Sequence, residues 1–288
     1  MEGSMEGKIC MVTGGTAGIG LVTARALAER RATVIIVGRN AQKGEAVVRD
    51  LRLRSGNDWI AFQRADLSRQ DEVKRLARQF VEEHPRLDVL VNNAGAIFHS
   101  RQMSAEGIEM TLALNHLNYF LLTGLLLDRL RAAGPARIVN VASRAHENAA
   151  LDLDDLQSAR HYRGWRAYCN SKLANILFTY GLARRLDGEA ITVNALHPGF
   201  VRSDFGRNNN LLFRLALKVA MLGAIGVEEG AETSIHLAAS PEAAAVTGRY
   251  FVRCRAVASS ALSQDVALGE ALWAASEALT GFHYTAGG

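Results

Sequence analysis

Residues 8–38 read KICMVTGGTAGIGLVTARALAERRATVIIVG, and this stretch decides the fold. The apolar runs at 8–14 and 32–38 predict two strands, and the alanine- and leucine-rich run at 18–31 predicts a helix between them. Two strands joined by a helix pair in parallel through a right-handed crossover. The stretch therefore predicts the first unit of a parallel α/β sheet.

The same alternation continues to the end of the chain. Further strands are predicted at 59–66, 87–93, 136–143, 191–199 and 248–251. Further helices are predicted at 41–56, 69–84, 104–133, 166–186, 227–239 and 264–279. Apolar strands joined by helices favour a Rossmann-type doubly wound parallel sheet of about seven strands, with helices on both faces. No repeat or linker interrupts residues 1–288, so we expect one domain.

Composition narrows the class of protein. The net charge is +4 and the basic residues are scattered, so a nucleic-acid partner is not expected. Three distant cysteines without a CxxC pair, and histidines without ligand spacing, predict no metal site and a reducing compartment. The N-terminus carries no apolar targeting segment, and the apolar run at 211–226 is too short to span a bilayer. We therefore expect a cytoplasmic protein without a transmembrane segment.

A glycine-rich turn, TGGTAGIG at 13–20, follows the first predicted strand. Glycine lets a backbone turn tightly and approach a pyrophosphate, and the helix N-terminus then faces the anion. The spacing is GxxxGxG through Gly14, Gly18 and Gly20, and it differs from the dinucleotide fingerprint GxGxxG. A plain strand-to-helix turn stays the alternative, but the place of the turn after the first strand favours a dinucleotide.

The second predicted strand ends at Gly38-Arg39-Asn40. An acidic residue here would bind a ribose 2′-hydroxyl, whereas an arginine meets a 2′-phosphate. Arg39 therefore favours NADP(H) over NAD(H), and a solvated loop arginine is the alternative.

Polar residues also end the third and fourth predicted strands. Asp66, followed by Leu67, is placed to accept from an adenine amino group or to cap the next helix. Asn92 and Asn93, followed by Ala94-Gly95, are placed to tie neighbouring strand ends together beside a cofactor. Asn115 falls inside a predicted helix, where asparagine has low propensity, so we expect a buried polar role.

The run RAYCNSKLANILFTYGLARRL at 166–186 predicts an amphipathic helix. Tyr168 and Lys172 are four residues apart and lie on one helix face. An ammonium near a phenol favours the phenolate and lowers its pKa, so the pair can act as a general acid and base. Ser143, at the end of the fifth predicted strand, is placed to hold a substrate oxygen. Two ordinary residues on a half-exposed helix remain the alternative for the pair alone.

The sixth predicted strand ends at His197-Pro198-Gly199. Proline and glycine force an abrupt exit there, which leaves this backbone beside a nicotinamide. We interpret His197 as a structural residue rather than a catalytic one.

In this order, TGGTAGIG, Asp66, NNAG, Asn115, Ser143, YxxxK and PG resemble the short-chain dehydrogenase/reductase family over nearly the whole chain. The runs VNVASRAH, YCNSKLANILFTYGLARRL, NALHPGFVRSDFGR and VTGRYF are similar to its retinol dehydrogenase and protochlorophyllide reductase-like branch. The resemblance implies hydride transfer between a nicotinamide and a carbonyl compound.

The resemblance also implies roles for individual residues. Tyr168 is the expected acid and base, Lys172 lowers its pKa and binds the ribose, Ser143 polarises the carbonyl, and Asn115 holds a relay water. Cofactor contacts are expected at Gly14, Thr16, Ala17, Gly18, Ile19, Gly20, Arg39, Asn40, Asp66, Leu67, Asn93, Ala94, Gly95, Tyr168, Lys172, Pro198, Gly199, Val201 and Ser203.

Three features depart from the family pattern. Ala17 stands where many NADP-preferring relatives carry a basic residue, so Arg39 bears the cofactor selectivity alone. Ser203 replaces the usual threonine near the carboxamide and keeps a hydroxyl. The membrane-bound retinol enzymes have an N-terminal anchor that this sequence does not show.

Two segments are expected to shape the substrate site. The insert at 144–167 is longer than usual for the family and predicts a flap, which favours a monomer or homodimer. The apolar run at 204–226 is either a mobile lid or a packed helix. Candidate substrate contacts are His146, Trp165, Phe200 and Phe205, with Phe98 and His161 also considered.

These features together predict an NADP(H)-dependent oxidoreductase acting on an apolar ketone, aldehyde or alcohol. A C=C double-bond reductase of the same family is the first alternative, because it also uses tyrosine and lysine. A non-catalytic NADP(H)-binding module is the second, but it predicts the loss of a catalytic residue, and none is lost.

Overall fold

The computed structural model describes residues 4–199 and 226–284. The strands are β1 Ile9–Thr13, β2 Thr33–Gly38, β3 Ile60–Arg64, β4 Val89–Asn92, β5 Ala136–Val141, β6 Ile191–His197, β7 Arg249–Val252 and β8 Arg255–Val257. They form one sheet in the order β3-β2-β1-β4-β5-β6-β7-β8. The first seven strands are parallel and β8 is antiparallel to β7. The predicted doubly wound α/β fold is confirmed.

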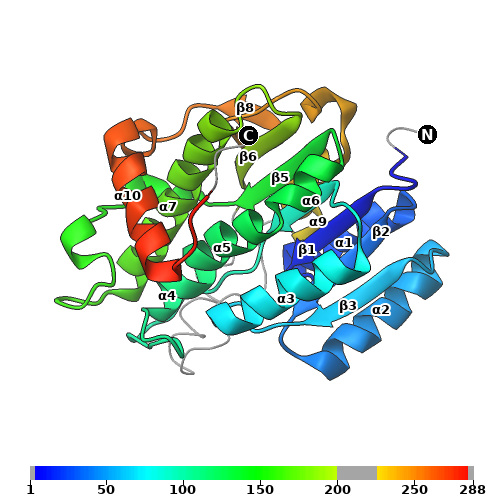
Figure 1. The fold of residues 1–288 in the computed structure, drawn as a ribbon, viewed down its shortest axis with the longest axis horizontal. Coiled ribbons are helices and arrows are strands. Elements are labelled where there is room, and N and C mark those ends of the chain that lie inside the picture. The colour runs from blue at the N-terminus through cyan, green and yellow to red at the C-terminus, as the bar shows by residue number, and fades with distance from the viewer. Residues whose placement is uncertain (1–3, 200–225, 285–288) are drawn as a thin grey trace.

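Helices cover both faces of this sheet (Figure 1). The α-helices are α1 Gly18–Glu29, α2 Ala41–Ser55, α3 Gln70–Glu83, α4 Met110–Leu112, α5 Asn118–Leu125, α6 Leu127–Ala132, α7 Gly164–Arg185, α9 Val227–Ala239 and α10 Val266–Thr280. The shorter turns are the π turn η1 Ala113–Leu117 and the 3₁₀ turns η2 Arg144–Asn148, η3 Leu153–Asp155, η5 Pro241–Ala243 and η6 Ala261–Gln264.

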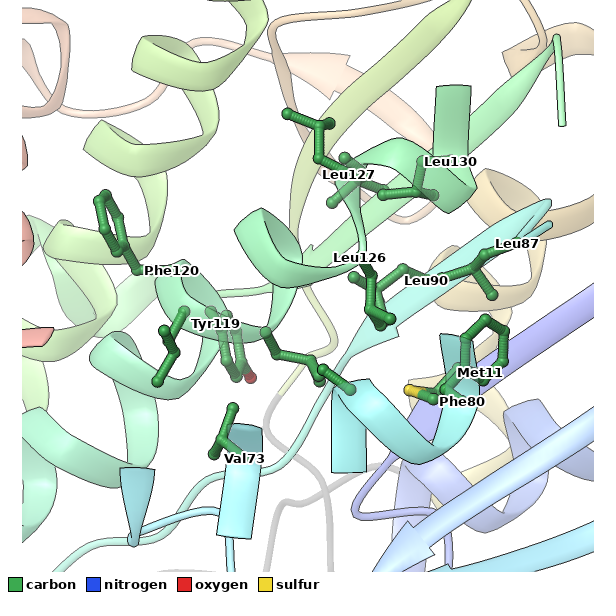
Figure 2. Packing of buried hydrophobic residues seen from close by; sticks show 14 of the residues in the cluster. Met11, Val73, Phe80, Leu87, Leu90, Tyr119, Phe120, Leu126, Leu127 and Leu130 are labelled. Atoms are coloured by element: carbon green, nitrogen blue, oxygen red, sulfur yellow. The ribbon is translucent and has the colours of Figure 1, made fainter. Parts of the chain in front are cut away.

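The sheet separates two apolar cores. Because side chains alternate along a strand, Met11 of β1 joins α3, α5, α6, α7 and α10 on one face, whereas Val12 joins α1, α2 and α9 on the other. Figure 2 shows part of the first core, with Met11 and Leu90 of the sheet near Phe80 of α3. Each fully buried side chain of this kind contributes about 1.5–3 kcal/mol relative to exposure. Burial on both faces explains why the central strands β1, β2 and β4 are almost entirely apolar.

The long helix predicted at 104–133 is wrong as one unit. Gly107 adopts a φ of +72°, and helix starts only after Glu109, whose carboxylate accepts from the main-chain N–H groups of Thr111 and Leu112. A π turn then follows at Ala113–Leu117, and the helix is interrupted again at Leu126, between α5 and α6. Apolar periodicity alone does not mark such interruptions, because each short piece still buries one face.

The count of about seven strands omits β8. This strand has three residues and all of them are exposed, so the sequence has no apolar run that would predict it. It folds back on β7 through a two-residue turn in which Arg253 and Cys254 have φ values of 49° and 60°. Such turns usually carry asparagine and glycine, and the residues here give no turn signal.

Candidate active site

The turn after β1 is built by close backbone packing. Gly14 and Gly18 have φ values of +64° and +55°, a region that favours glycine. A Cβ on Gly20 would lie 2.5 Å from Asn93 Nδ2 and 2.6 Å from the Gly14 carbonyl oxygen. Asn93 Nδ2 in turn donates to the Thr13 carbonyl over 2.8 Å, so the predicted link between strand ends is present.

This turn has the features of an anion site. Helix α1 begins directly after it, and its N-cap Ala17 provides no side-chain hydrogen bond to the first N–H groups. Uncapped N–H groups at a helix N-terminus, together with the helix dipole, favour a phosphate. The cradle therefore fits the pyrophosphate of a dinucleotide, at the place the sequence predicted.

The carboxyl end of β2 lies next to the same turn. The Gly15 N–H donates to the Val37 carbonyl over 3.3 Å, and a Cβ on Gly38 would be 3.0 Å from Thr16 Cγ2, so the end of β2 is close to the turn. Arg39 is exposed immediately after Gly38. Asn40 caps α2, because its Oδ1 accepts from the main-chain N–H of Lys43 over 2.8 Å. The side chain of Asn40 is thus committed to the helix. Arg39 is the exposed basic residue at this strand end, where a 2′-phosphate is expected.

Asp66 stabilises the turn that follows β3. Its Oδ1 accepts from the hydroxyl of Ser68 over 2.7 Å and from the main-chain N–H of Ser68 over 3.1 Å. Helix α3 has Arg69 as its N-cap, so the alternative in which Asp66 caps this helix is not what the structure shows. The side chain of Leu67 packs into the core. An adenine contact at Asp66 stays a prediction.

The expected catalytic pair lies near the start of α7. Tyr168 and Lys172 are 8% and 4% exposed. Lys172 Nζ lies 5.6 Å from the centre of the Tyr168 ring and donates to the Val141 carbonyl, at the end of β5, over 2.9 Å. Ser143 is two residues further on, and its hydroxyl lies close enough to Tyr168 to act on the pKa of that phenol. Tertiary structure thus brings the predicted serine, tyrosine and lysine together.

The direction of the tyrosine pKa differs from the sequence expectation. Burial raises the pKa of Tyr168, and the nearby Ser143 hydroxyl only partly opposes this. Burial also lowers the pKa of Lys172 to about 7, because a buried ammonium loses its hydration. The prediction that Lys172 sets the tyrosine pKa below its usual value is therefore wrong for the protein alone, since desolvation of both groups outweighs their mutual effect.

Asn115 sits in the π turn η1, as a fully buried residue. Its Nδ2 donates to the Ala96 carbonyl over 2.9 Å and to Ser171 Oγ over 3.0 Å, and its Oδ1 accepts from the Ala96 N–H over 2.9 Å. A Cβ on Gly95 would lie 3.2 Å from Asn115 Oδ1 and 3.6 Å from Lys172 Nζ. The expected buried polar role is confirmed, and the side chain joins the loop after β4 to α7.

Trp165 and His146, both predicted to contact substrate, differ in exposure and in their contacts. Trp165 is 57% exposed and its ring centre lies 5.8 Å from that of Tyr168, so it stands at the edge of the catalytic group. His146 is buried instead: its Nδ1 bonds the Ser143 carbonyl over 2.7 Å and its Nε2 accepts from the Ser260 N–H over 3.1 Å. The prediction of His146 as a substrate contact is wrong, because both ring nitrogens are used to hold the backbone around Ser143.

The other substrate candidates do not extend the site. Phe98 is buried, and its carbonyl accepts from the Tyr162 hydroxyl over 2.9 Å. His161 is exposed on the insert, within which η2 and η3 form. The candidates Phe200, Val201, Ser203 and Phe205, and nearly all of the 204–226 segment, lie outside the described residues.

His197, at the end of β6, is consistent with the predicted structural role. Its Nδ1 accepts from the main-chain N–H of Arg144 over 3.2 Å, and burial lowers its pKa to about 4. Pro198 and Gly199 follow at the same sheet edge, and Gly199 has a φ of +91°. The abrupt exit expected after this strand is therefore present.

A network of buried amide and hydroxyl groups lies beneath the site, and the sequence indicated only one of its members, Asn92. Asn92 Nδ2 donates to Thr123 Oγ1 and to Asn140 Oδ1, each over 2.9 Å. Asn140 Nδ2 then donates to Thr179 Oγ1 of α7 over 2.9 Å. The asparagine at the end of β4 was a visible signal, but its partners come from segments up to 87 positions away and share no local pattern.

A cavity of about 730 Å³ lies elsewhere, between α7 and the β7–β8 hairpin. Tyr180, Arg184 and Arg249 are among its lining residues, and none of the expected catalytic residues contributes to it. We therefore place the candidate site by its chemistry, at the carboxyl edge of the sheet, rather than in this cavity.

Comparisons with known proteins match most of the chain. The model of the short chain dehydrogenase family matches residues 8–211. Retinol dehydrogenase 12 from Homo sapiens is 39% identical over 280 residues, which cover 97% of this chain and 88% of that protein. Retinol dehydrogenase 14 from Homo sapiens is 40% identical over 299 residues, with the same shares covered.

Solved structures are similar over most of the chain. An uncharacterized protein from Mycobacterium paratuberculosis has a TM-score of 0.81 and 31% identity, with 99% of this chain and 97% of that chain covered. The NADP complex of RhlG from Pseudomonas aeruginosa has a TM-score of 0.68 and 33% identity, with 86% and 95% covered.

Proposed function

Because this chain belongs to the short-chain dehydrogenase family, in its retinol dehydrogenase-like branch, we propose that it is an NADP(H)-dependent oxidoreductase of apolar ketones, aldehydes or alcohols. Membership establishes oxidoreductase chemistry with a nicotinamide cofactor; the phosphate on that cofactor, the substrate class and the residue roles are the proposal. Buried Tyr168 and Lys172 lie with half-buried Ser143 at the sheet edge that carries the glycine turn, and this set supports the proposal most strongly.

The reaction joins a hydride and a proton to a carbonyl group, or removes both from an alcohol. When bound, the nicotinamide supplies or accepts the hydride at the substrate carbon. The Ser143 hydroxyl orients the substrate oxygen by a hydrogen bond. Tyr168 gives its hydroxyl proton to that oxygen during reduction and takes it back during oxidation. Lys172 holds positive charge near the phenolate that remains after the proton leaves.

Burial keeps the Tyr168 hydroxyl in its acid form. A phenol whose pKa is raised by burial stays protonated at neutral pH and is ready to act as an acid. Oxidation of an alcohol needs the phenolate instead, which burial disfavours. The protonated form of Tyr168 is thus the form that donates the proton in carbonyl reduction.

We propose NADP(H) over NAD(H) because of the residues that follow β2. Arg39 is exposed at the β2 edge beside the glycine turn, and no acidic residue stands between Gly38 and Ala41 to bind a free 2′-hydroxyl. RhlG, with 33% identity to this chain, has been solved as an NADP complex. An apolar substrate is proposed because the exposed indole of Trp165 lies beside Tyr168.

The organisation of the chain belongs to the same proposal. The described elements pack on one sheet, which supports a single domain over 1–288 with 144–167 and 204–226 beside the substrate site. Among the described residues, no helix is both long enough and apolar enough to cross a bilayer. A cytoplasmic location and a monomer or homodimer stay predictions.

Calorimetry of NADPH and NADH binding tests the cofactor choice. We expect wild-type protein to bind NADPH about 10- to 100-fold more tightly than NADH, because a guanidinium–phosphate pair contributes about 1.5–3 kcal/mol. Arg39→Asp should reverse the preference. Arg49→Asp, the same charge change on the exposed face of α2, should keep it. Equal affinity for both cofactors in wild type would refute the role of Arg39.

Turnover with NADPH and a panel of apolar carbonyl compounds tests the reaction itself. Identification of the product separates the proposal from the double-bond alternative, since only carbonyl reduction yields an alcohol. A protein that binds neither cofactor would refute the enzyme assignment.

A further inference from the structure

His116 follows Asn115 in the π turn and has no place in the reaction described above. It is 1% exposed, and burial lowers its pKa to about 4, so the ring is neutral at physiological pH. Both ring nitrogens nevertheless have partners. Nδ1 lies 3.4 Å from Asn175 Oδ1 of α7, and Nε2 lies 3.0 Å from Ser276 Oγ of α10.

Asn115 and His116 together form two polar contacts with one face of α7. Ser171 and Asn175 are four residues apart, so they lie one turn apart on that face. Asn115 contacts Ser171 over 3.0 Å, and His116 contacts Asn175 over 3.4 Å. The Ser171 hydroxyl also donates to the Tyr168 carbonyl over 2.7 Å. The two contacts therefore hold the stretch of helix that carries Tyr168 and Lys172.

Helix α10 contacts the ring nitrogen of His116 that does not face α7. It lies alongside α7 (Figure 1), where Leu272 packs against Leu173 and Leu177. Apolar contacts of this kind tolerate small sliding movements, whereas a hydrogen bond is lost once its atoms separate by a few tenths of an ångström. The contact between His116 and Ser276 thus fixes the position of the histidine ring relative to α10 more closely than packing alone does. Ser276 lies beyond residues 8–211, which the family model covers.

We propose that His116 is a positioning residue, which fixes the axial register of α7 against the π turn and is itself held in place by Ser276. The inference rests on the proposed function, because the register matters through Tyr168 and Lys172. A π turn carries one residue more than an α-helical turn and is found mostly where tertiary contacts maintain it. Asn115 and His116 are the two polar side chains inside this turn, and both are bonded to α7.

A loss of register would reduce the reaction rate more than cofactor binding. The glycine turn and the β2 edge belong to other elements and keep their geometry. Tyr168 would move relative to Ser143, which is anchored by β5 and His146. Small displacements of an acid from its substrate are costly, and about 1 Å can change a rate 10²-fold.

Two variants on α10 form a matched test. Ser276→Ala removes the hydroxyl that lies 3.0 Å from His116 Nε2 and 2.8 Å from the Leu272 carbonyl oxygen, and whose single proton is donated to one of the two. Thr280→Val removes a buried hydroxyl one turn further along, whose bond to the Ser276 carbonyl is 2.7 Å long. Each change removes one buried hydroxyl from α10, and Thr280→Val also removes the bond that Thr280 Oγ1 accepts from the Phe282 N–H over 3.3 Å. Only the first change touches His116.

The first measurement is hydrogen–deuterium exchange of the full chain, which needs no substrate. We expect exchange in 110–120 and 164–176 to be at least about twofold faster in Ser276→Ala than in Thr280→Val. The second is steady-state kinetics with NADPH. We expect kcat about 3- to 10-fold lower in Ser276→Ala, with KM for NADPH within about twofold, and Thr280→Val close to wild type.

The outcomes separate this inference from the proposed function. Equal exchange in the two variants would overturn the register role of His116. Faster exchange with an unchanged kcat would overturn its importance for catalysis. A wild-type protein without turnover would refute the proposed function, and the exchange comparison would still decide the register role of His116.

Discussion

The glycine turn at 13–20 and the cluster around Tyr168 lie at the same edge of the sheet, but different forces hold them. The turn is made of main-chain atoms so close together that a Cβ on Gly20 would lie 2.6 Å from the Gly14 carbonyl oxygen. The cluster is made of side chains from distant segments, such as Asn115 of η1 and Lys172 of α7, joined by buried hydrogen bonds.

This difference predicts opposite weaknesses. A main-chain cradle tolerates loss of nearby side-chain groups but not an added carbon, because there is no space to hold it. The stability of a cluster of buried polar side chains depends above all on its hydrogen bonds. When one partner is removed, the other is left buried and unpaired, which costs about 1–3 kcal/mol. Substitutions in the two regions should therefore separate cofactor binding from chemistry.

The largest effect is expected for Tyr168→Phe, which removes the acid and keeps the ring. General acid–base groups contribute about 10²- to 10⁴-fold, so we expect kcat to fall about 10³-fold while the Kd for NADPH stays within about twofold. Tyr180→Phe on the same helix loses a hydroxyl bonded to Ser259 Oγ over 2.7 Å and should keep near-normal turnover. A Tyr168→Phe variant with near-normal kcat would show that another group supplies the proton.

Gly20→Ala is expected to have the second-largest effect, and to weaken cofactor binding rather than to lower kcat. The added methyl would overlap Asn93 Nδ2, 2.5 Å away, and push the turn outward. We expect the Kd for NADPH to rise about 10- to 100-fold, as measured by calorimetry, because overpacking costs about 1–3 kcal/mol.

Gly269→Ala is the matched control for that prediction. Gly269 also lies in the first turn of a helix, but its added Cβ would be 3.7 Å from Leu177 Cδ2, an ordinary contact. This variant should keep its NADPH affinity and gain about 0.5–1 kcal/mol of stability. Unchanged affinity in Gly20→Ala as well would mean that the cradle is not the cofactor site.

The smallest effect is a pH-dependent one at Lys172. The pKa of this lysine is near 10.5 in the unfolded chain and about 7 in the folded protein. Between these values the unfolded chain binds more protons, so wild-type stability should rise with pH, by up to about 1.4 kcal/mol per unit. Below pH 7 both states are charged and the full cost of burial is present.

Lys172→Met removes this dependence. The variant should be more stable than wild type at pH 6.5, and urea denaturation should show the difference shrinking by roughly 2 kcal/mol by pH 9. A stability difference that stays constant from pH 6.5 to 9 would show that Lys172 keeps its ordinary pKa in the folded protein.

The sequence by itself determined the alternation of strands and helices, and with it the sheet edge where the site lies. Apolar runs of strand length and helical periodicity are local properties, so nearly every main element appears within a few residues of its predicted bounds. Gly14 and Gly20 were also visible locally, because a cradle of main-chain atoms needs glycine at fixed positions. The interruption at η1 and the short strand β8 left no such local signal.

Tertiary structure alone decided what the buried polar side chains do. His146 was predicted to contact substrate, yet it holds the Ser143 carbonyl and the Ser260 N–H. The pKa of Tyr168 was predicted to fall, yet burial raises it. In each case the outcome depends on desolvation and on partners far away in the chain. Neither is encoded by the spacing of neighbouring residues, because both arise only when the helices close over the sheet.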